Sequence, residues 1–267
     1  MSSSRGLLLC CCTLLDVGVR VFYRFRHCFP TSRASSRSSV RANLQIGSVG
    51  RCTSKRNRAG RLGPGGGTGG RRGRGKGAYR LRIRSWNVGS LTSKSIELAK
   101  ILQKRKINIA CVQETRWVRS RAKDADGYKL WYSGVQRVKN GVGILVDRHL
   151  KESVVEVRRV NDRLMTIKLV VSECTLNVTS AYAPQAGLDE EIKRHFWEGL
   201  DEIVRNISPV ERLFIGGDFS GHIGSAAGGY IEVHGGFGFG ERNGGGTSLL
   251  DFAKAFELVI ANSSFPK

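Results

Sequence analysis

Four short polar motifs, each directly after a run of apolar residues, constrain this chain more than any other feature of its sequence. They are Trp86-Asn87, Gln113-Glu114-Thr115, Tyr182-Ala183-Pro184 and Gly217-Asp218-Phe219-Ser220. Apolar runs that stop in polar residues are typical of strands that deliver side chains to one rim of a sheet. An amide, a phenol and two carboxylates on one rim can hold a hard cation beside a phosphate oxygen. The motifs therefore indicate metal-assisted phosphodiester chemistry.

The apolar pattern from residue 81 to 267 predicts alternating strands and helices. Strands are expected over 81–88, 107–113, 128–133, 142–146, 152–160, 163–171, 174–182, 212–216 and 258–261. Helices are expected over 95–106, 188–207 and 248–256. The first two strands flank a helix and should pair side by side, whereas the strands from 128 to 182 should form an antiparallel meander. Mixed strands flanked by helices on two sides predict a four-layer α/β sandwich.

The first 80 residues differ in composition from the rest of the chain. They hold 17 Lys or Arg and a single acid, Asp16, so most of the formal net charge of +22 belongs to them. We predict a disordered Ser/Arg-rich leader over 1–59, a flexible Gly/Arg-rich linker over 60–79, and one domain over 80–267. The acid-free stretch from 20 to 58 is also typical of an organellar transit peptide. Arg-Gly tracts bind RNA electrostatically, which offers the leader a further role.

Neither the apolar stretches nor the cysteines indicate a membrane or secreted protein. The stretch over 7–15 falls short of the ~20 residues that a membrane span needs. The seven cysteines lack the spacing of a zinc site or of a disulfide scaffold, which favours a reducing compartment. Cys111 is expected to be a small buried apolar residue.

Taken in order, the four motifs resemble the signatures of the endonuclease/exonuclease/phosphatase superfamily, which includes apurinic endonucleases and pancreatic deoxyribonuclease. The glycine-rich stretches over 221–224 and 236–240 extend the similarity to craniofacial development protein 2-like proteins and to endonuclease domains of RTE-clade non-LTR retrotransposons. The resemblance covers about residues 81–267 and is specific because four motifs occur in the right order. It implies a four-layer α/β/β/α sandwich and Mg²⁺- or Mn²⁺-dependent hydrolysis of DNA by a monomeric nuclear protein.

The resemblance also implies a role for each residue of the motifs. Glu114 would hold the metal, with the amide oxygen of Asn87 on the metal or its water. Asp218 would orient or activate the attacking water, and Tyr182 would contact phosphate. From the residues alone, Asn87 also fits a turn before Gly89, Tyr182 a packed core residue, and Asp218 a cap.

Further residues are expected near the substrate. Arg242 would meet a phosphate and Asn243 would position the network of Asp218, although a surface loop is an equal alternative. The basic group after Glu114 would suit the DNA backbone, and a solvated face is its alternative. Its members are Arg116, Arg119, Arg121 and Lys123.

Two departures from the family pattern bear on activity. Ser220 stands where the family has an Asn that steadies the phosphate, and losing such a donor typically costs on the order of 10²-fold in rate. The family's closing strands and catalytic His do not follow within the sequence, and His222, in the loop that follows Asp218, is not expected to substitute. We therefore expect a sandwich that is incomplete at its C-terminal strands and an impaired endonuclease derived from a retrotransposon. The alternatives are a non-catalytic nucleic-acid or chromatin-binding protein acting through the basic leader, and a phosphatase for small phosphomonoesters.

Overall fold

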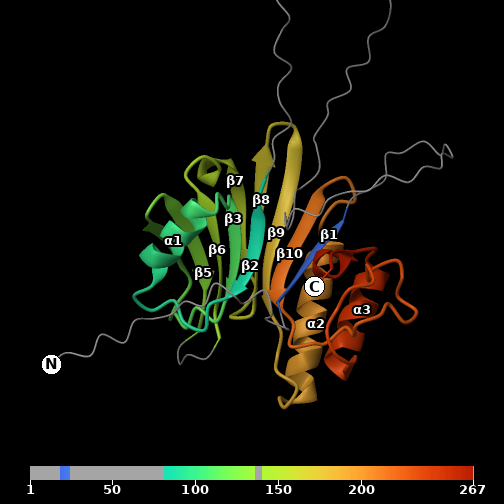
Figure 1. Cartoon of the computed structure of the whole chain (residues 1–267). Coiled ribbons are helices and arrows are strands. Elements are labelled where there is room, and N and C mark those ends of the chain that lie inside the picture. Colours follow the sequence, from blue (N-terminus) through green and yellow to red (C-terminus); the bar gives the residue numbers. More distant parts are fainter. Residues whose placement is uncertain (1–18, 25–80, 136–139, 267) are drawn as a thin grey trace, which may run out of the picture.

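The computed structural model describes residues 19–24, 81–135 and 140–266, and these form two facing β-sheets with helices on both outer sides (Figure 1). The larger sheet has six strands in the order β11-β1-β10-β9-β8-β7. The smaller sheet has five strands in the order β2-β3-β6-β5-β4. Three buried clusters fill the spaces between the layers, so the predicted α/β/β/α sandwich is confirmed.

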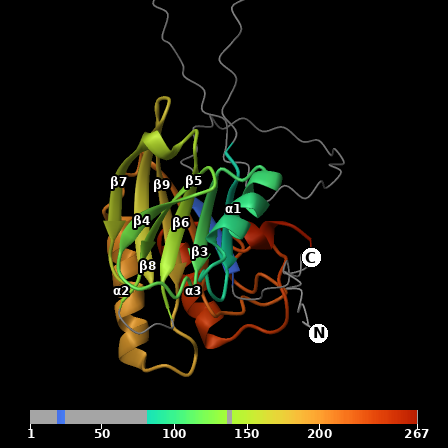
Figure 2. The ribbon, with the colours of Figure 1, turned by 90° about the vertical axis from the view of Figure 1, so that its left-hand side faces the viewer.

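The smaller sheet begins with β2 (Ile83–Asn87) and β3 (Ile109–Gln113), which pair in parallel across α1 (Ser95–Lys104). Antiparallel pairing then adds three strands: β6 (Val142–Asp147), β5 (Tyr128–Ser133) and β4 (Arg121–Ala125). Helix α1 buries Leu98, Ala99 and Leu102 against the outer face of this sheet, where it lies in Figure 2. The pairing of β2 with β3 was predicted, because two strand-like runs lie on either side of a segment with the apolar spacing of a helix.

The larger sheet contains β7 (Val154–Arg159), β8 (Leu164–Val171), β9 (Cys174–Tyr182) and β10 (Arg212–Asp218). Strands β7, β8 and β9 are antiparallel, and β10 runs parallel to β9. Helices α2 (Glu190–Arg205) and α3 (Gly244–Ala255) cover its outer face. Short elements complete the fold: 3₁₀ turns Lys151–Ser153 and Ala261–Ser264, and strand β11 (Val259–Ile260).

The meander prediction was wrong in one respect, because its strands divide between the two sheets. The chain leaves the smaller sheet after β6 and enters the larger one at β7. Both faces of β6 are buried, and the side chains of β6 and β8 that face each other belong to one core cluster. Burial of two sheet faces against each other is a tertiary preference that the local pattern of turns does not encode.

Strand β4 was not predicted either, because its sequence has no apolar alternation. Four of its five residues are exposed, and it pairs only with β5 at the edge of the sheet. Exposed charged side chains suit such an edge, since they discourage pairing with another chain.

A strand in the leader corrects the prediction of disorder for six residues. β1 (Val19–Arg24) pairs antiparallel with β10 and with β11. The rest of the predicted leader and the whole predicted linker over 60–79 lie outside the described residues. Within the described part, no helix has the length and apolar character to span a membrane.

Candidate active site

The ends of four strands meet at one rim between the two sheets. Asn87 and Gln113 end β2 and β3, and Tyr182 and Asp218 end β9 and β10, with each pair in register. In both parallel pairs the carboxyl ends of the strands lie at this rim. Hydrogen bonds connect the four groups there in a chain, from the Tyr182 phenol to the Glu114 carboxylate, the Asn87 amide and the Asp218 carboxylate.

Asn87 connects the two carboxylates. Its Nδ2 donates to Oε1 of Glu114 at 2.9 Å and to Oδ2 of Asp218 at 2.8 Å, while its Oδ1 accepts from the backbone N–H of Gly89 at 3.0 Å. The amide therefore separates two negative charges that would otherwise repel. The turn expected before Gly89 is therefore present, and the NH2 group of Asn87, not its amide oxygen, faces the two acids.

Glu114 is held by three donors. Its Oε1 accepts from Asn87 and from the Tyr182 hydroxyl at 2.9 Å, and its Oε2 accepts from Nη2 of Arg116 at 3.3 Å. Partial burial is the largest single influence on its pKa and acts upward, yet these donors and the Arg116 charge together hold the pKa of Glu114 below its ordinary value. The Glu114 carboxylate is thus ionised at neutral pH.

The backbone at the end of β3 is unusual. Glu114 and Arg116 have φ angles of 57° and 54°, in the left-handed region that non-glycine residues rarely adopt. Between them Thr115 is fully buried, with its N–H donating to the carbonyl of Gly141 and its carbonyl accepting from Leu91. Because Thr115 is anchored in this way, the strained residues on either side turn their side chains to the rim.

Tyr182 serves as a neutral donor. Only 5% of its surface is exposed, and burial, the hydrogen bond to Glu114 and the charge of Asp218 raise the pKa of its phenol. The hydroxyl therefore keeps its proton at neutral pH and can donate to an anionic oxygen.

Arg163 belongs to the site, although the sequence analysis did not identify it. Its guanidinium lies 5.2 Å from the centre of the Tyr182 ring, and its Nη1 donates to the Tyr182 carbonyl at 3.3 Å. It sits in the turn between β7 and β8, where Oδ1 of Asn161 accepts from the N–H groups of Arg163 and Leu164. The Asn-Asp turn signal before it was visible in the sequence, but its closeness to Tyr182 depends on the pairing of β8 with β9.

Gln113 supports the rim from below. It is fully buried, and its Nε2 donates to Oγ of Ser180 at 3.2 Å and to the carbonyl of Gly216 at 3.4 Å, while Oε1 accepts from Ser85. These bonds join the two sheets directly beneath the carboxylates. Gly216 is required there, because a Cβ would lie 2.9 Å from Cβ of Cys111. Cys111 itself is buried, as predicted.

Ser220 follows Asp218 in a strained conformation. Its φ is 48°, and its backbone N–H donates to Oδ1 of Asp218 at 3.1 Å. That bond orients the carboxylate toward Asn87 and the rim. Asn adopts this left-handed region more readily than Ser, which gives the family's Asn a backbone advantage as well as an amide.

Arg242 and Asn243 have structural partners. The Arg242 guanidinium donates to three carbonyls, those of Ile223, Ala227 and Gly228, and stacks 4.8 Å from the Tyr230 ring. Asn243 caps α3, since its Oδ1 accepts from the N–H groups of Gly246 and His222. Their contacts therefore support loop and helix, rather than the substrate and Asp218 roles expected from the sequence.

The Arg242 contacts predict a stability effect. Arg242→Ala should lower the free energy of unfolding by about 2 kcal/mol, because three charge-assisted hydrogen bonds to loop carbonyls are lost. Thermal and urea unfolding measure this, with the exposed Arg119→Ala as the matched control. Equal stability of the two variants would show that the hydrogen bonds from Arg242 to the loop carbonyls do not stabilise the fold.

The donor set of the rim fits a hard divalent cation. Oxygens of Glu114 and Asp218 converge on the same Asn87 nitrogen, and the Tyr182 hydroxyl lies beside Glu114, whereas the Asn87 amide oxygen accepts from Gly89. Among the described residues, no group of three or more His, Cys, Asp or Glu is placed to hold a metal. Mg²⁺ suits this set, because it takes one or two carboxylates and keeps several waters.

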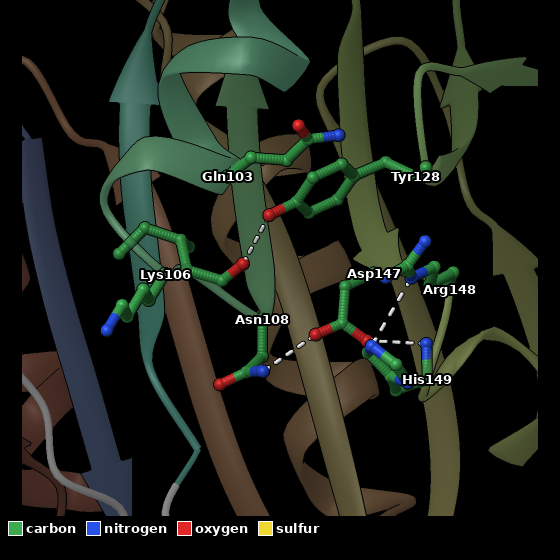
Figure 3. A pocket seen from close by; sticks show the side chains of 9 residues that line it. Gln103, Lys106, Asn108, Tyr128, Asp147, Arg148 and His149 are labelled. Carbon is green, nitrogen blue, oxygen red and sulfur yellow. Dashed lines mark hydrogen bonds between the residues drawn. The ribbon is translucent and has the colours of Figure 1, made fainter.

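A pocket of about 400 Å³ lies at the opposite end of the smaller sheet (Figure 3). The pocket is separate from Glu114 and Asp218, because its lining residues lie at the start of β3 and at the end of β6. Its polar groups are bonded to one another: Asn108 donates to Asp147 at 2.7 Å, and Tyr128 donates to the Ile107 carbonyl at 2.5 Å. In Figure 3 the Lys106 side chain points away from Arg148 and His149, so the cations do not converge on a ligand.

Comparisons with known proteins identify the family. The model of the Endonuclease/Exonuclease/phosphatase family matches residues 85–250, which include all four motifs. Craniofacial development protein 2 of Tragulus javanicus is 28% identical over 185 residues, covering 68% of this chain and 32% of that protein. The Bos taurus protein is also 28% identical over 185 residues, covering 68% and 31%. This chain thus spans about a third of the length of these relatives.

Solved structures show the same kind of similarity. The endonuclease domain of TRAS1, a telomere-specific non-LTR retrotransposon, aligns with a TM-score of 0.44 and 19% identity over 66% of this chain and 70% of that one. An AP endonuclease from Archaeoglobus fulgidus aligns with a TM-score of 0.36 and 23% identity over 48% and 52%.

Proposed function

Because this chain belongs to the Endonuclease/Exonuclease/phosphatase family, we propose that it hydrolyses phosphodiester bonds of DNA with the help of Mg²⁺ or Mn²⁺, as an endonuclease of the apurinic type derived from a retrotransposon. The observation that carries the proposal is the joining of Glu114 and Asp218 through Asn87 at the rim. We further propose that it acts in the nucleus, as a monomer.

The residues of the rim have separate tasks in this proposal. Glu114 would hold the ion, and the Asn87 amide oxygen, which here accepts from Gly89, would have to turn toward the rim to join it. The ion would supply positive charge to a phosphoryl oxygen and to the leaving oxygen. Asp218, oriented by the N–H of Ser220, would align the attacking water and accept its proton. The Tyr182 phenol keeps its proton, and its hydroxyl would turn from Glu114 to donate to a phosphoryl oxygen when substrate binds.

Positive charge around the rim supports a polyanionic substrate. Arg163 lies over Tyr182, and Arg116 contacts Glu114 with 48% of its side chain exposed. Arg119, Arg121 and Lys123 follow on an exposed segment, with Lys123 lying 5.4 Å from the centre of the Trp117 ring. Such residues would track the DNA backbone and make binding depend on salt.

A plasmid assay tests the proposal. The full chain with Mg²⁺ should convert supercoiled DNA to nicked circles slowly, and faster where abasic sites are present. EDTA should stop the cutting and added Mg²⁺ should restore it, because the ion carries charge that the two carboxylates cannot replace. Nicking that continues in EDTA would contradict the assignment of a metal site.

The same preparation distinguishes the other functions. Release of phosphate from a small phosphomonoester without nicking would favour a phosphatase. Salt-dependent DNA retention without any cleavage would favour a binding protein acting through its basic leader, which holds 17 Lys or Arg. Replacing Arg71, Arg72, Arg74 and Lys76 with glutamine would then weaken retention, and retention of RNA by the same variant would measure any RNA role.

A further inference from the structure

Strand β1 occupies an unusual place in the larger sheet. It comes from the start of the chain, yet it lies between β10 and β11, two strands near the other end (Figure 1). It pairs with β10 from Leu213 to Asp218 and with both residues of β11. The 58 residues from 25 to 82 separate it from β2.

The neighbours of β1 depend on it for backbone pairing. One edge of β10 is paired with β9, and in the described part of the chain its other edge is paired with β1 alone. Strand β11 joins the sheet through β1, with one isolated bridge between Ile260 and His234. Five residues of β10 are buried, so removal of β1 would leave N–H and C=O groups unpaired beside a core.

The register links this pairing to the candidate active site. Val19 lies opposite Asp218, and Val21 lies opposite Gly216, whose carbonyl accepts from Gln113. The antiparallel ladder therefore fixes β10 along the stretch that carries the catalytic carboxylate. Strand β1 thus pairs with the same strand that ends in Asp218.

We propose that β10 and β11 form a strand-accepting slot, and that its occupant is residues 19–24 of the same chain, held by backbone pairing and exchangeable with a separate peptide of that sequence. Recognition in such a slot uses main-chain hydrogen bonds along an exposed edge. A covalent tether keeps the strand at a high effective concentration, so the chain's own segment outcompetes a second copy at micromolar protein. The link to cleavage rests on the proposed function, whereas occupancy of the slot does not.

Proline substitution in the full chain tests the slot. Val21→Pro removes a backbone N–H and restricts φ in the middle of β1, so hydrogen-exchange protection should fall by at least about tenfold for those amides of residues 213–218 that face β1 and not β9. Val40→Pro, in the leader but outside β1, is the matched control and should leave that protection unchanged. Equal protection in the two variants would overturn the proposal.

A peptide of residues 17–26 then supplies the strand in trans. Added to Val21→Pro, it should restore protection of β10, and a scrambled peptide should not. Where Val21→Pro is insoluble alone, refolding with the peptide should recover soluble protein, and continued insolubility would overturn the proposal. A wild-type dimer that exchanges labelled subunits would instead assign the slot to a second copy. If the peptide restored hydrogen-exchange protection of β10 but the protein did not nick DNA, the proposed slot would stand and the proposed function would be contradicted.

Discussion

Glu114→Gln is expected to lower Mg²⁺-dependent nicking by on the order of 10³-fold, since a metal ion contributes several kcal/mol of charge stabilisation. Glutamine keeps the size of the side chain and an oxygen for Tyr182, but it lacks the charge that attracts the cation. Residual activity should require more Mg²⁺ than the wild type does. Initial nicking rates over a Mg²⁺ titration measure both effects.

The control for this prediction is Glu173→Gln, an exposed residue in the turn between β8 and β9. It should leave both the rate and the Mg²⁺ requirement unchanged. Equal rates for Glu114→Gln and the wild type would remove Glu114 from the mechanism.

Glu114 also predicts how stability changes with pH. Its pKa is lowered in the folded protein, so its contribution to stability is present above the unfolded pKa of about 4.3 and is lost as the pH falls through the folded value. Glutamine does not titrate, so the variant should lose less stability than the wild type over that acidic range.

Ser220→Asn is expected to raise the nicking rate by on the order of 10²-fold, because it supplies an amide donor for the phosphate that the family motif has and this chain lacks. The φ of 48° at this position also suits Asn better than Ser, so the variant should be at least as stable as the wild type. Rates on abasic-site DNA and thermal unfolding measure the two effects.

Ser220→Gly separates the backbone from the amide. Glycine relieves the left-handed strain but adds no donor, so it should raise stability without the gain in rate. A Gly variant as fast as the Asn variant would show that the backbone at this position, and not the amide, limits the reaction.

Residues that end strands could be assigned to the site from the sequence. Asn87, Glu114, Tyr182 and Asp218 each follow an apolar run, and parallel pairing of β2 with β3 and of β9 with β10 brings them to one rim. Arg163 could not be found in this way, because it precedes its strand and reaches Tyr182 only through an antiparallel neighbour. Arg242 was predicted to contact substrate. Its hydrogen bonds to loop carbonyls could not be foreseen, because backbone carbonyls are the same at every position of a sequence.

Local pattern determined the helices, most strands and the four polar motifs, because hydrophobic period and strand-end residues act over a few positions. Tertiary structure alone decided how the strands divide between two sheets, since that depends on which buried faces pack together. It also decided the place of β1. Its six residues pair with a strand almost 200 positions away, and unpaired backbone at a buried edge, rather than any pattern in the leader, provides the physical reason.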